Sequence, residues 1–223
     1  IMLQMTGEPV VKTAEEYVSE EKDVKTPEDA VAGAKDIIAE SISDNADYRT
    51  RIRELTFKEG VLTSAAKDAE AKTVFEMYYN FSEPAATMAG HRIRAVNRGE
   101  TEKILTVKIE APVDKILAYL EKQIIVRDNQ YTTVIIKEAI EDSYERLIAP
   151  SIEREIRNQL TETAEAGAIK VFGKNLEQLL LQPPITGHVV LGWDPAFRTG
   201  CKLAVVDATG KVLDTTVIYP TAP

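Results

Sequence analysis

The chain has little of what defines several common protein classes. Its 223 residues include one cysteine and two histidines. A single cysteine excludes an internal disulfide framework and fits a reducing compartment, so we expect a cytoplasmic protein. So few cysteines and histidines also argue against a structural zinc site. No apolar run is long enough to cross a bilayer, and no membrane partner is therefore expected.

Positive charge is also scarce, since the formal net charge is −9. The excess of acidic residues is uneven. Residues 1–60 hold 8 Lys and Arg against 14 Asp and Glu, whereas residues 88–127 hold 8 against 5. Nucleic-acid binding depends on the local field rather than on the sum, so a basic face within 88–127 can still meet phosphate. The alternative is an ordinary solvated surface of mixed charge.

Helical periodicity dominates the first part of the chain. Thr26-Pro27-Glu28-Asp29 is typical of a helix start, with a capping threonine, a proline in the first turn and two acids near the positive helix end. Ser43-Asp44 is predicted to cap a second helix that ends near Gly60. Residues 61–68 are predicted to form a loop, and residues 69–80 a helix.

Shorter elements follow. A helix is predicted from Gly90, closed by Asn97-Arg98-Gly99 as a C-terminal cap. Residues 103–109 alternate apolar and polar side chains, which predicts a strand. Pro112 is predicted to start the next helix, whose apolar side chains recur at helical spacing.

The strongest helical periodicity covers residues 131–166. Pro150 lies inside it and is predicted to kink or restart the helix near Ile148. We expect Gly167 to end this helix and a separate, shorter helix to follow. Pro183-Pro184 then predicts a stiff linker, and we place a domain boundary there.

Residues 189–219 have a different pattern, three short apolar runs separated by two turns. This arrangement predicts three consecutive antiparallel strands. Asp194 falls at the end of the first strand. Asp207 lies in the second turn, at the other end of the hairpin and about 20 Å away if each strand residue rises about 3.3 Å.

Asp194 is the strongest single candidate for chemistry. A carboxylate at a strand end can bind a divalent cation, but two-metal phosphoryl chemistry needs several carboxylates that converge. Asp207 lies too far away to help, and Asp214 lies along the third strand. We therefore expect no metal site and regard Asp194 as a vestigial catalytic position. The alternative is that Asp194 simply starts the turn before Pro195.

Arg198 and Lys202 lie in and after the first of these turns, beside Gly200. A glycine lets backbone come close to a ligand, and the two cations can hold a phosphate. The alternative is a hairpin loop with solvated basic residues.

A second basic set, Arg92, Arg94 and Arg98, lies on the helix predicted from Gly90. Arg94 and Arg98 are four residues apart and share a face of that helix, so phosphate contact is plausible. The alternative is pairing within the chain, with carboxylates at 100 and 102.

Four stretches resemble the Tex family of bacterial transcription accessory proteins. They are GAKDIIAE (33–40), FSEP (81–84), HRIRAVNRGE (91–100) and, above all, VLGWDPAFRTGCKLAVVDATGKVLDTTVIYP (190–220). The resemblance implies a helical scaffold followed by a YqgF-type, ribonuclease H-like domain in a longer protein. The YqgF-type motif usually reads Asp-Pro-Gly, but this chain has Asp194-Pro195-Ala196, which weakens the case for a working metal loop.

Together these observations predict a mainly α protein. Residues 1–187 are expected to form a helical scaffold with one short β segment near 103–109. Residues 188–223 are expected to form a truncated ribonuclease H-like (YqgF-type) antiparallel β-meander. The resemblance also implies that the chain is an internal fragment of a nucleic-acid-binding protein, with RNA or DNA, and RNA polymerase, as candidate partners.

Three functions from different classes remain open on the sequence alone. The first is a non-catalytic, nucleic-acid-linked scaffold without a cofactor. The second is a Mg²⁺-dependent nuclease or resolvase that uses Asp194. The third is an actin-like sugar kinase or ATPase, because that class also opens with a strand, an Asp and a small-residue turn. In addition, an unpaired edge strand invites pairing between copies, so residues 211–219 are a candidate for self-association.

Overall fold

The computed structural model describes residues 1–183, 185–196 and 198–220. It divides the chain into two compact units, Ile1–Lys170 and Val171–Pro223. The chain is mainly helical and also contains two small three-stranded antiparallel sheets. The expected fold class is therefore confirmed.

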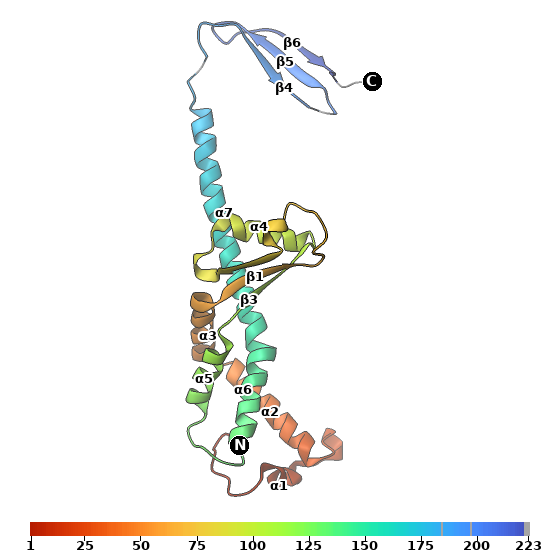
Figure 1. Cartoon of the computed structure of the whole chain (residues 1–223), viewed down its shortest axis with the longest axis vertical. Coiled ribbons are helices and arrows are strands. Elements are labelled where there is room, and N and C mark those ends of the chain that lie inside the picture. Colours follow the sequence, from red (N-terminus) through yellow and green to blue (C-terminus); the bar gives the residue numbers. More distant parts are fainter. Residues whose placement is uncertain (184, 197, 221–223) are drawn as a thin grey trace. The chain divides into compact units, whose positions relative to one another are not determined.

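The first unit combines seven α-helices with one sheet among the described residues, and Figure 1 shows their order along the chain. The helices are α1 (Val10–Ala14), α2 (Pro27–Ser43), α3 (Ala46–Glu59), α4 (Gly90–Thr101), α5 (Val113–Ile124), α6 (Thr133–Asp142) and α7 (Ala149–Leu180). The strands are β1 (Val61–Ala66), β2 (Asn80–Pro84) and β3 (Leu105–Glu110). The helix α7 continues into the second unit.

The start of α2 is confirmed as a reciprocal capping box. The Asp29 backbone N–H donates to the Thr26 hydroxyl at 3.1 Å, and the Asp29 carboxylate accepts from the Thr26 backbone N–H at 2.9 Å. The cap predicted for the next helix is wrong by one residue. Asn45, not Ser43-Asp44, caps α3, because its side-chain oxygen accepts the backbone N–H groups of Asp47 and Tyr48.

The sheet of the first unit corrects two predictions. Residues 61–68, expected to be a loop, contain β1, the central strand of the order β2-β1-β3. Residues 69–80, expected to be a helix, contain only a 3₁₀ turn (Glu76–Tyr78) before β2 begins. The strand expected at 103–109 is confirmed as β3, whose Leu105, Val107 and Ile109 are buried.

The false helix at 69–80 has a physical explanation. Phe75 and Tyr78 are three residues apart and both are buried in the core. A 3₁₀ turn, like an α-helix, places residues i and i+3 on the same side. Val74, which a helix would have helped to bury, is 83% exposed.

The helix α4 also extends beyond its predicted end at Asn97-Arg98-Gly99. Gly99 lies inside the helix and is buried. A Cβ at this position would lie 2.6 Å from the Leu105 Cδ1 atom, so glycine permits close packing of α4 on β3 rather than ending the helix. Figure 1 shows α4 lying across the sheet.

The long helical region at 131–166 is interrupted where Pro150 predicts it. The helix α6 passes into a π-helical segment (Ser143–Ile148), and α7 begins at Ala149. A proline has no backbone N–H and disturbs the hydrogen bonds of the preceding turn, which accounts for the change of helix type. Gly167 does not end α7, because one helical glycine costs only about 1 kcal/mol.

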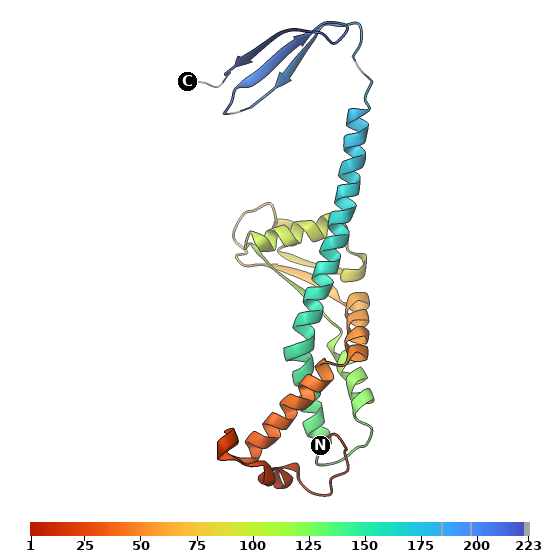
Figure 2. The ribbon, with the colours of Figure 1, turned by 180° about the vertical axis from the view of Figure 1, so that it is seen from behind.

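One apolar core holds the first unit together. Its members come from α2 to α7, from the π-helical segment and from the sheet. Figures 1 and 2 show α2 crossing beside α6, and the two helices are in contact. The edge of β3 is covered by α7: the Glu153 carboxylate accepts from the Ile109 backbone N–H at 2.9 Å. Covering the edge in this way protects it from pairing with another strand.

The second unit contains the predicted meander. Its strands are β4 (Val190–Asp194), β5 (Cys201–Val206) and β6 (Val212–Ile218), in the order β4-β5-β6. Both pairings are antiparallel. Pro184, part of the predicted linker, and Phe197, part of the first turn, lie outside the described residues. No helix in the described part of the chain is long and apolar enough to cross a membrane.

Candidate nucleic-acid interface

The helix α4 presents a basic face because its other face is built for packing. Ile93, Val96 and Gly99 are buried, whereas Arg94 and Arg98 are exposed. No side chain caps the N-terminus of α4, which lies against α7: a Cβ on Gly90 would lie 3.2 Å from the Ala164 Cα atom. The candidate cations therefore stand on a helix that is firmly seated in the first unit.

Two of the three arginines are paired within the chain. Arg92 Nη1 lies 2.8 Å from a carboxylate oxygen of Glu83, which raises the pKa of Arg92. Arg98 Nε lies 2.7 Å from a carboxylate oxygen of Glu102, the pairing weighed as the alternative. Arg94 is exposed and forms no ion pair with another described residue. Exposed pairs contribute about 0–1 kcal/mol, so a phosphate can replace them.

A fourth arginine, missed by the sequence analysis, fixes the position of this helix. Arg157 of α7 lies 2.5 Å from a Glu100 oxygen and donates to the Asn97 side chain at 3.0 Å and to the Val107 carbonyl at 3.2 Å. Its side chain is only 17% exposed. No local pattern reveals this role, since its partners lie 50 or more residues away in sequence. Arg157 positions α4 but is too buried to meet a ligand itself.

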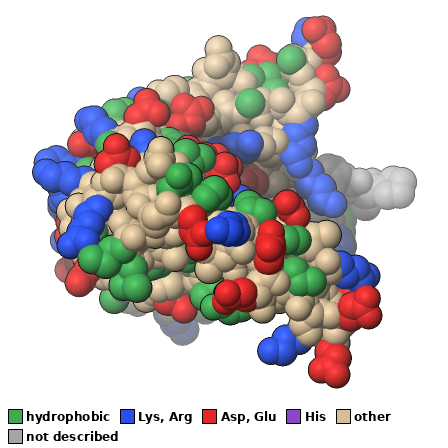
Figure 3. Space-filling model, turned by 90° about the horizontal axis from the view of Figure 1, so that it is seen from below, with side chains coloured by type: hydrophobic (Ala, Val, Ile, Leu, Met, Phe, Trp, Pro, Cys, Tyr) green, Lys and Arg blue, Asp and Glu red, His purple; other side chains and the backbone are tan. Residues whose placement is uncertain are grey.

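One face of the molecule can be seen to have mixed charge (Figure 3). On the face drawn in Figure 3, basic and acidic side chains are interspersed. A nucleic-acid contact on this unit would therefore be local, as expected from the uneven charge along the chain.

The second unit places Asp194 as predicted, at the end of β4 and exposed, opposite Lys202 in the β4–β5 pairing. A hollow of about 610 Å³ lies beside them, over the three strands of the meander. Gly192 and Ala204, which face each other in the same pairing, have small or no side chains and contribute to its lining. The lining of the hollow thus contains one carboxylate, Asp194, and one cation, Lys202, and its other side chains are apolar or carry a hydroxyl.

Among the described residues of the second unit, no other acid lies at this end of the meander. Asp207 follows the opposite end of β5 and is held in its turn by hydrogen bonds from Thr209 and from the Lys211 backbone N–H. These bonds, first that of the Thr209 side chain, lower the pKa of Asp207. Among residues 1–183, 185–196 and 198–220, no three potential metal ligands come together.

The remaining predicted residues, Arg198 and Lys202, are exposed on either side of Gly200. Gly200 has a φ of +76°, and a Cβ there would lie 2.7 Å from side-chain atoms of Val217 and Tyr219. The absence of a side chain at Gly200 thus permits a tight turn packed against β6, whether or not a ligand also approaches the backbone there. Binding by these two residues stays a prediction, as does binding by the arginines of α4.

Comparison with family models gives two matches in consecutive parts of the chain. Residues 6–172 match the model "Tex central region-like". Residues 188–223 match the model "Tex protein YqgF-like domain". The two matches have the order that the sequence resemblance implied.

Individual relatives agree with these matches. The chain is 58% identical to the uncharacterized protein YdcI of Bacillus subtilis, over 95% of the chain and 30% of that protein. It is 31% identical to the transcriptional accessory protein Tex of Neisseria gonorrhoeae, over 98% of the chain and 30% of that protein. It is 34% identical to the human S1 RNA-binding domain-containing protein 1, over 89% of the chain and 21% of that protein. The chain thus spans less than a third of each of these relatives.

Proposed function

The chain belongs to the Tex family, and from this premise we propose that it is the scaffold and the first YqgF-like strands of a longer transcription accessory protein. In this proposal the parent protein binds RNA or DNA, with RNA polymerase as a further partner, and this part of it positions nucleic acid without cutting it. The observation that carries the proposal is the match of residues 6–172 and 188–223 to two Tex models in sequence.

The names of relatives support the nucleic-acid part of this proposal. One relative is named as a transcriptional accessory protein and another as a protein with an S1 RNA-binding domain. Those names describe proteins more than three times as long as the matched part. The exposed Arg94, together with the easily exchanged pairs of Arg92 and Arg98, supports a local phosphate contact on this chain.

The position of Asp194 supports binding rather than cleavage. Two-metal hydrolysis needs carboxylates that converge on ions about 3.5–4 Å apart. The nearest acid along the chain, Asp207, lies at the opposite end of β5. Lys202 can hold a phosphate and Asp194 can accept from a ribose hydroxyl, but a lone carboxylate cannot assemble such a centre.

A metal-dependent nuclease remains the second candidate. The observation in its favour is the placement of Asp194 at a strand end beside a hollow of about 610 Å³. In this alternative, Asp194 would bind Mg²⁺ with carboxylates supplied by another part of the parent protein. Cleavage that requires a divalent cation and disappears in Asp194→Asn would establish it.

Salt-dependent binding tests the basic face of α4. Replacing Arg92, Arg94 and Arg98 by alanine is expected to reduce the slope of log K against log salt by about 0.9 for each duplex phosphate that is no longer neutralised. The matched control replaces Lys22, Lys58 and Lys122, which are exposed and lie on other segments, so the same charge is removed elsewhere. The control should keep the wild-type slope.

Arg94→Ala alone guards against a change in folding, because Arg94 has no ion pair to lose among the described residues. This variant should retain the wild-type melting temperature. It should nevertheless neutralise about one phosphate fewer than the wild type, which the salt dependence of binding measures. An unchanged affinity and slope in both the single and the triple variant would remove α4 from the interface.

A further inference from the structure

A cleft of about 500 Å³ lies in the first unit, away from the residues considered above. It is formed by α3, by the end of β3 with the start of α5, by the π-helical segment and by the start of α7. Its lining residues are Ile52, Thr56, Ile109, Glu110, Ala111, Val113, Tyr144, Glu145, Ala149, Ile152 and Glu153. Ile52, Ile109 and Ile152 are buried in the core, so the floor is apolar, whereas Glu110 and Glu145 are exposed at the rim.

A buried hydroxyl in this lining lacks a partner. Thr56 is 3% exposed, and its Oγ1 atom forms no hydrogen bond with any residue that the structure describes. Leaving a buried polar group unpaired is costly, and such groups in native structures call for an explanation. A ligand that supplies the missing hydrogen bond is one such explanation.

Tyr144 adds a donor to the same lining. It is 4% exposed, and burial raises the pKa of its hydroxyl, with smaller contributions from the carboxylates of Glu145 and Glu153. The hydroxyl therefore stays protonated across the neutral range. The carboxylates of Glu145 and Glu153 line the same cleft and make the electrostatic potential of this part negative.

Three carboxylates of the lining have no cation. Glu110, Glu145 and Glu153 come from three different elements, and none forms an ion pair with a described residue. Glu153 is held in place, because one of its oxygens accepts the Ile109 backbone N–H at 2.9 Å. Three unpaired acids over an apolar floor are complementary to a cation with an apolar stem.

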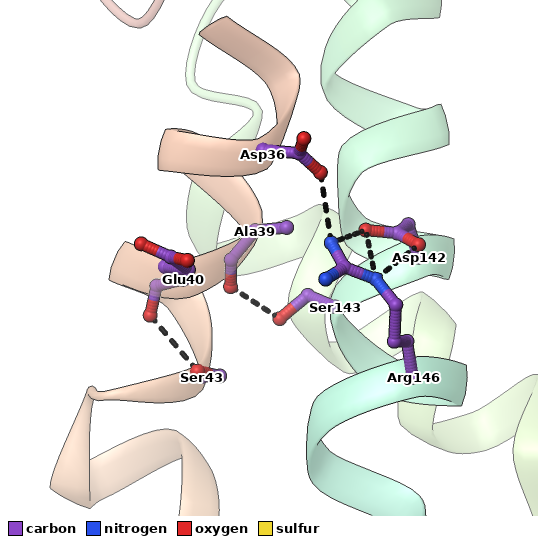
Figure 4. A network of polar contacts seen from close by, with 7 residues as sticks. All are labelled: Asp36, Ala39, Glu40, Ser43, Asp142, Ser143 and Arg146. Carbon is purple, nitrogen blue, oxygen red and sulfur yellow. Dashed lines mark hydrogen bonds and ion pairs between the residues drawn. The ribbon is translucent and has the colours of Figure 1, made fainter. Parts of the chain in front are cut away.

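The π-helical segment, which carries two of the lining residues, is held in place by contacts with α2. Figure 4 shows that the Ser143 hydroxyl donates to the Ala39 carbonyl, at 2.7 Å, and that Arg146 pairs with Asp142 at 2.6 Å and with Asp36 at 2.9 Å. The contacts of Ser143 with Ala39 and of Arg146 with Asp36 tie the segment to α2, while Tyr144 and Glu145 line the cleft. Single π-helical turns inside longer helices frequently occur at functional sites.

We propose that this cleft binds a basic segment of a protein partner, with the stem of one arginine or lysine on the apolar floor and the cationic heads of the segment among Glu110, Glu145 and Glu153. Charge complementarity selects the occupant. The described residues contain no three potential ligands close enough to hold one metal ion. Three separated carboxylates can instead be paired by several basic side chains of one peptide segment. An arginine of that segment can also donate a hydrogen bond to the Thr56 hydroxyl. This contact would be separate from any nucleic-acid contact on α4.

Fluorescence anisotropy with the full chain tests the proposal. The probe is a short labelled peptide in which arginine alternates with alanine, compared with the same peptide carrying glutamine in place of arginine. We expect the arginine peptide to bind and the glutamine peptide not to. The double variant Glu110→Gln/Glu145→Gln should weaken binding about tenfold or more. The control Glu162→Gln/Glu165→Gln changes the net charge equally on the exposed surface of α7 and should leave affinity unchanged.

A second variant separates the cleft from general acidity. Thr56→Val keeps the shape of the side chain and removes the unpaired hydroxyl, so it should weaken the arginine peptide without lowering the melting temperature. Equal weakening by both double variants, or unchanged binding in Glu110→Gln/Glu145→Gln, would overturn the proposal. So would spermidine displacing the peptide as effectively as unlabelled peptide, because the occupant would then be a free polyamine.

Discussion

The two units of the chain bury their apolar side chains to very different degrees. In the first unit, Ile52, Ile136 and Ile156 are completely buried in one core. In the second, Trp193 is 61% exposed and Leu213 is 55% exposed. Cys201 is the one buried hydrophobic residue of the second unit among those described. The first unit thus has a core of its own, and the second mainly displays apolar surface.

The pattern of exposure in the second unit indicates what its sheet is built for. Trp193 pairs with Leu203 on one face, and Val190 pairs with Val206 on the other, because successive residues of a strand point to opposite faces. A sheet that faces water on one side alternates apolar and polar residues, whereas a sheet covered on both sides is apolar on both. The meander carries apolar residues on both faces, although Trp193 is exposed. Apolar content alone therefore does not distinguish a core from a surface that requires a cover.

The largest expected effect sharpens this contrast. Ile156→Ala leaves a cavity in the core of the first unit and should lower the free energy of unfolding by about 2–5 kcal/mol. Leu213→Ala, on the exposed face of β6, should change it by about 0.5 kcal/mol or less. Urea unfolding followed by far-UV circular dichroism measures both. Similar losses in the two variants would show that the second unit has a core that its exposure does not reveal.

The next effect concerns the contact that seats α4. Arg157→Met removes the donor to Asn97, Glu100 and the Val107 carbonyl, and should cost about 1–3 kcal/mol because a half-buried carbonyl loses its partner. Arg154→Met is the matched control, since Arg154 is exposed on the same helix. If the two substitutions cost the same, Arg157 is not the anchor of α4.

The cap of α2 provides a smaller effect that depends on pH. Thr26→Ala should cost about 1 kcal/mol near neutral pH. Hydrogen bonding to Thr26, through its side chain and then its backbone N–H, lowers the pKa of Asp29. A lowered carboxyl pKa stabilises the folded state above the unfolded value of about 3.9, and the effect is lost as pH falls through the folded value.

The difference in stability between wild type and Thr26→Ala should therefore shrink in acid. Unfolding curves at neutral and acidic pH measure it. A difference that grows as pH falls would contradict the reciprocal cap.

The smallest effect lies in the turn of the second unit. Asp207 has a lowered pKa because Thr209 and Lys211 donate to it. Thr209→Val should move this pKa back toward its usual range, as followed by NMR titration of the carboxyl group. A pKa that stays low in Thr209→Val would mean that the backbone N–H groups suffice to hold the turn.

Elements whose determining contacts are local formed as predicted from the sequence. The Thr26–Asp29 cap and the glycine-containing turn after Asp207 are specified by neighbouring residues, and both elements form where they were predicted. β1 and β2 were not predicted, since β1 pairs with β3, about forty residues further along, and β2 in turn pairs with β1. The ends of α4 and α7 were predicted too early, because in the sequence a glycine inside a helix looks the same as a glycine that follows one.

The candidate site shows the same division. The alternation and turns of 189–219 were sufficient to place Asp194 at a strand end and Asp207 at the opposite end of β5. They did not reveal that Arg92 pairs with Glu83, nor that Arg157 holds α4, since these partners meet only in the folded chain. The cleft of the first unit depends on four separate segments and had no signal in the sequence.

One measurement tests the central claim that this chain positions nucleic acid and does not cut it. Labelled RNA and branched DNA are mixed with the chain in the presence of Mg²⁺, and anisotropy is recorded across a salt series while the nucleic acid is examined on a denaturing gel. We expect binding that weakens steeply with salt and nucleic acid that stays intact. Cleavage that requires the divalent cation and is abolished in Asp194→Asn would contradict it.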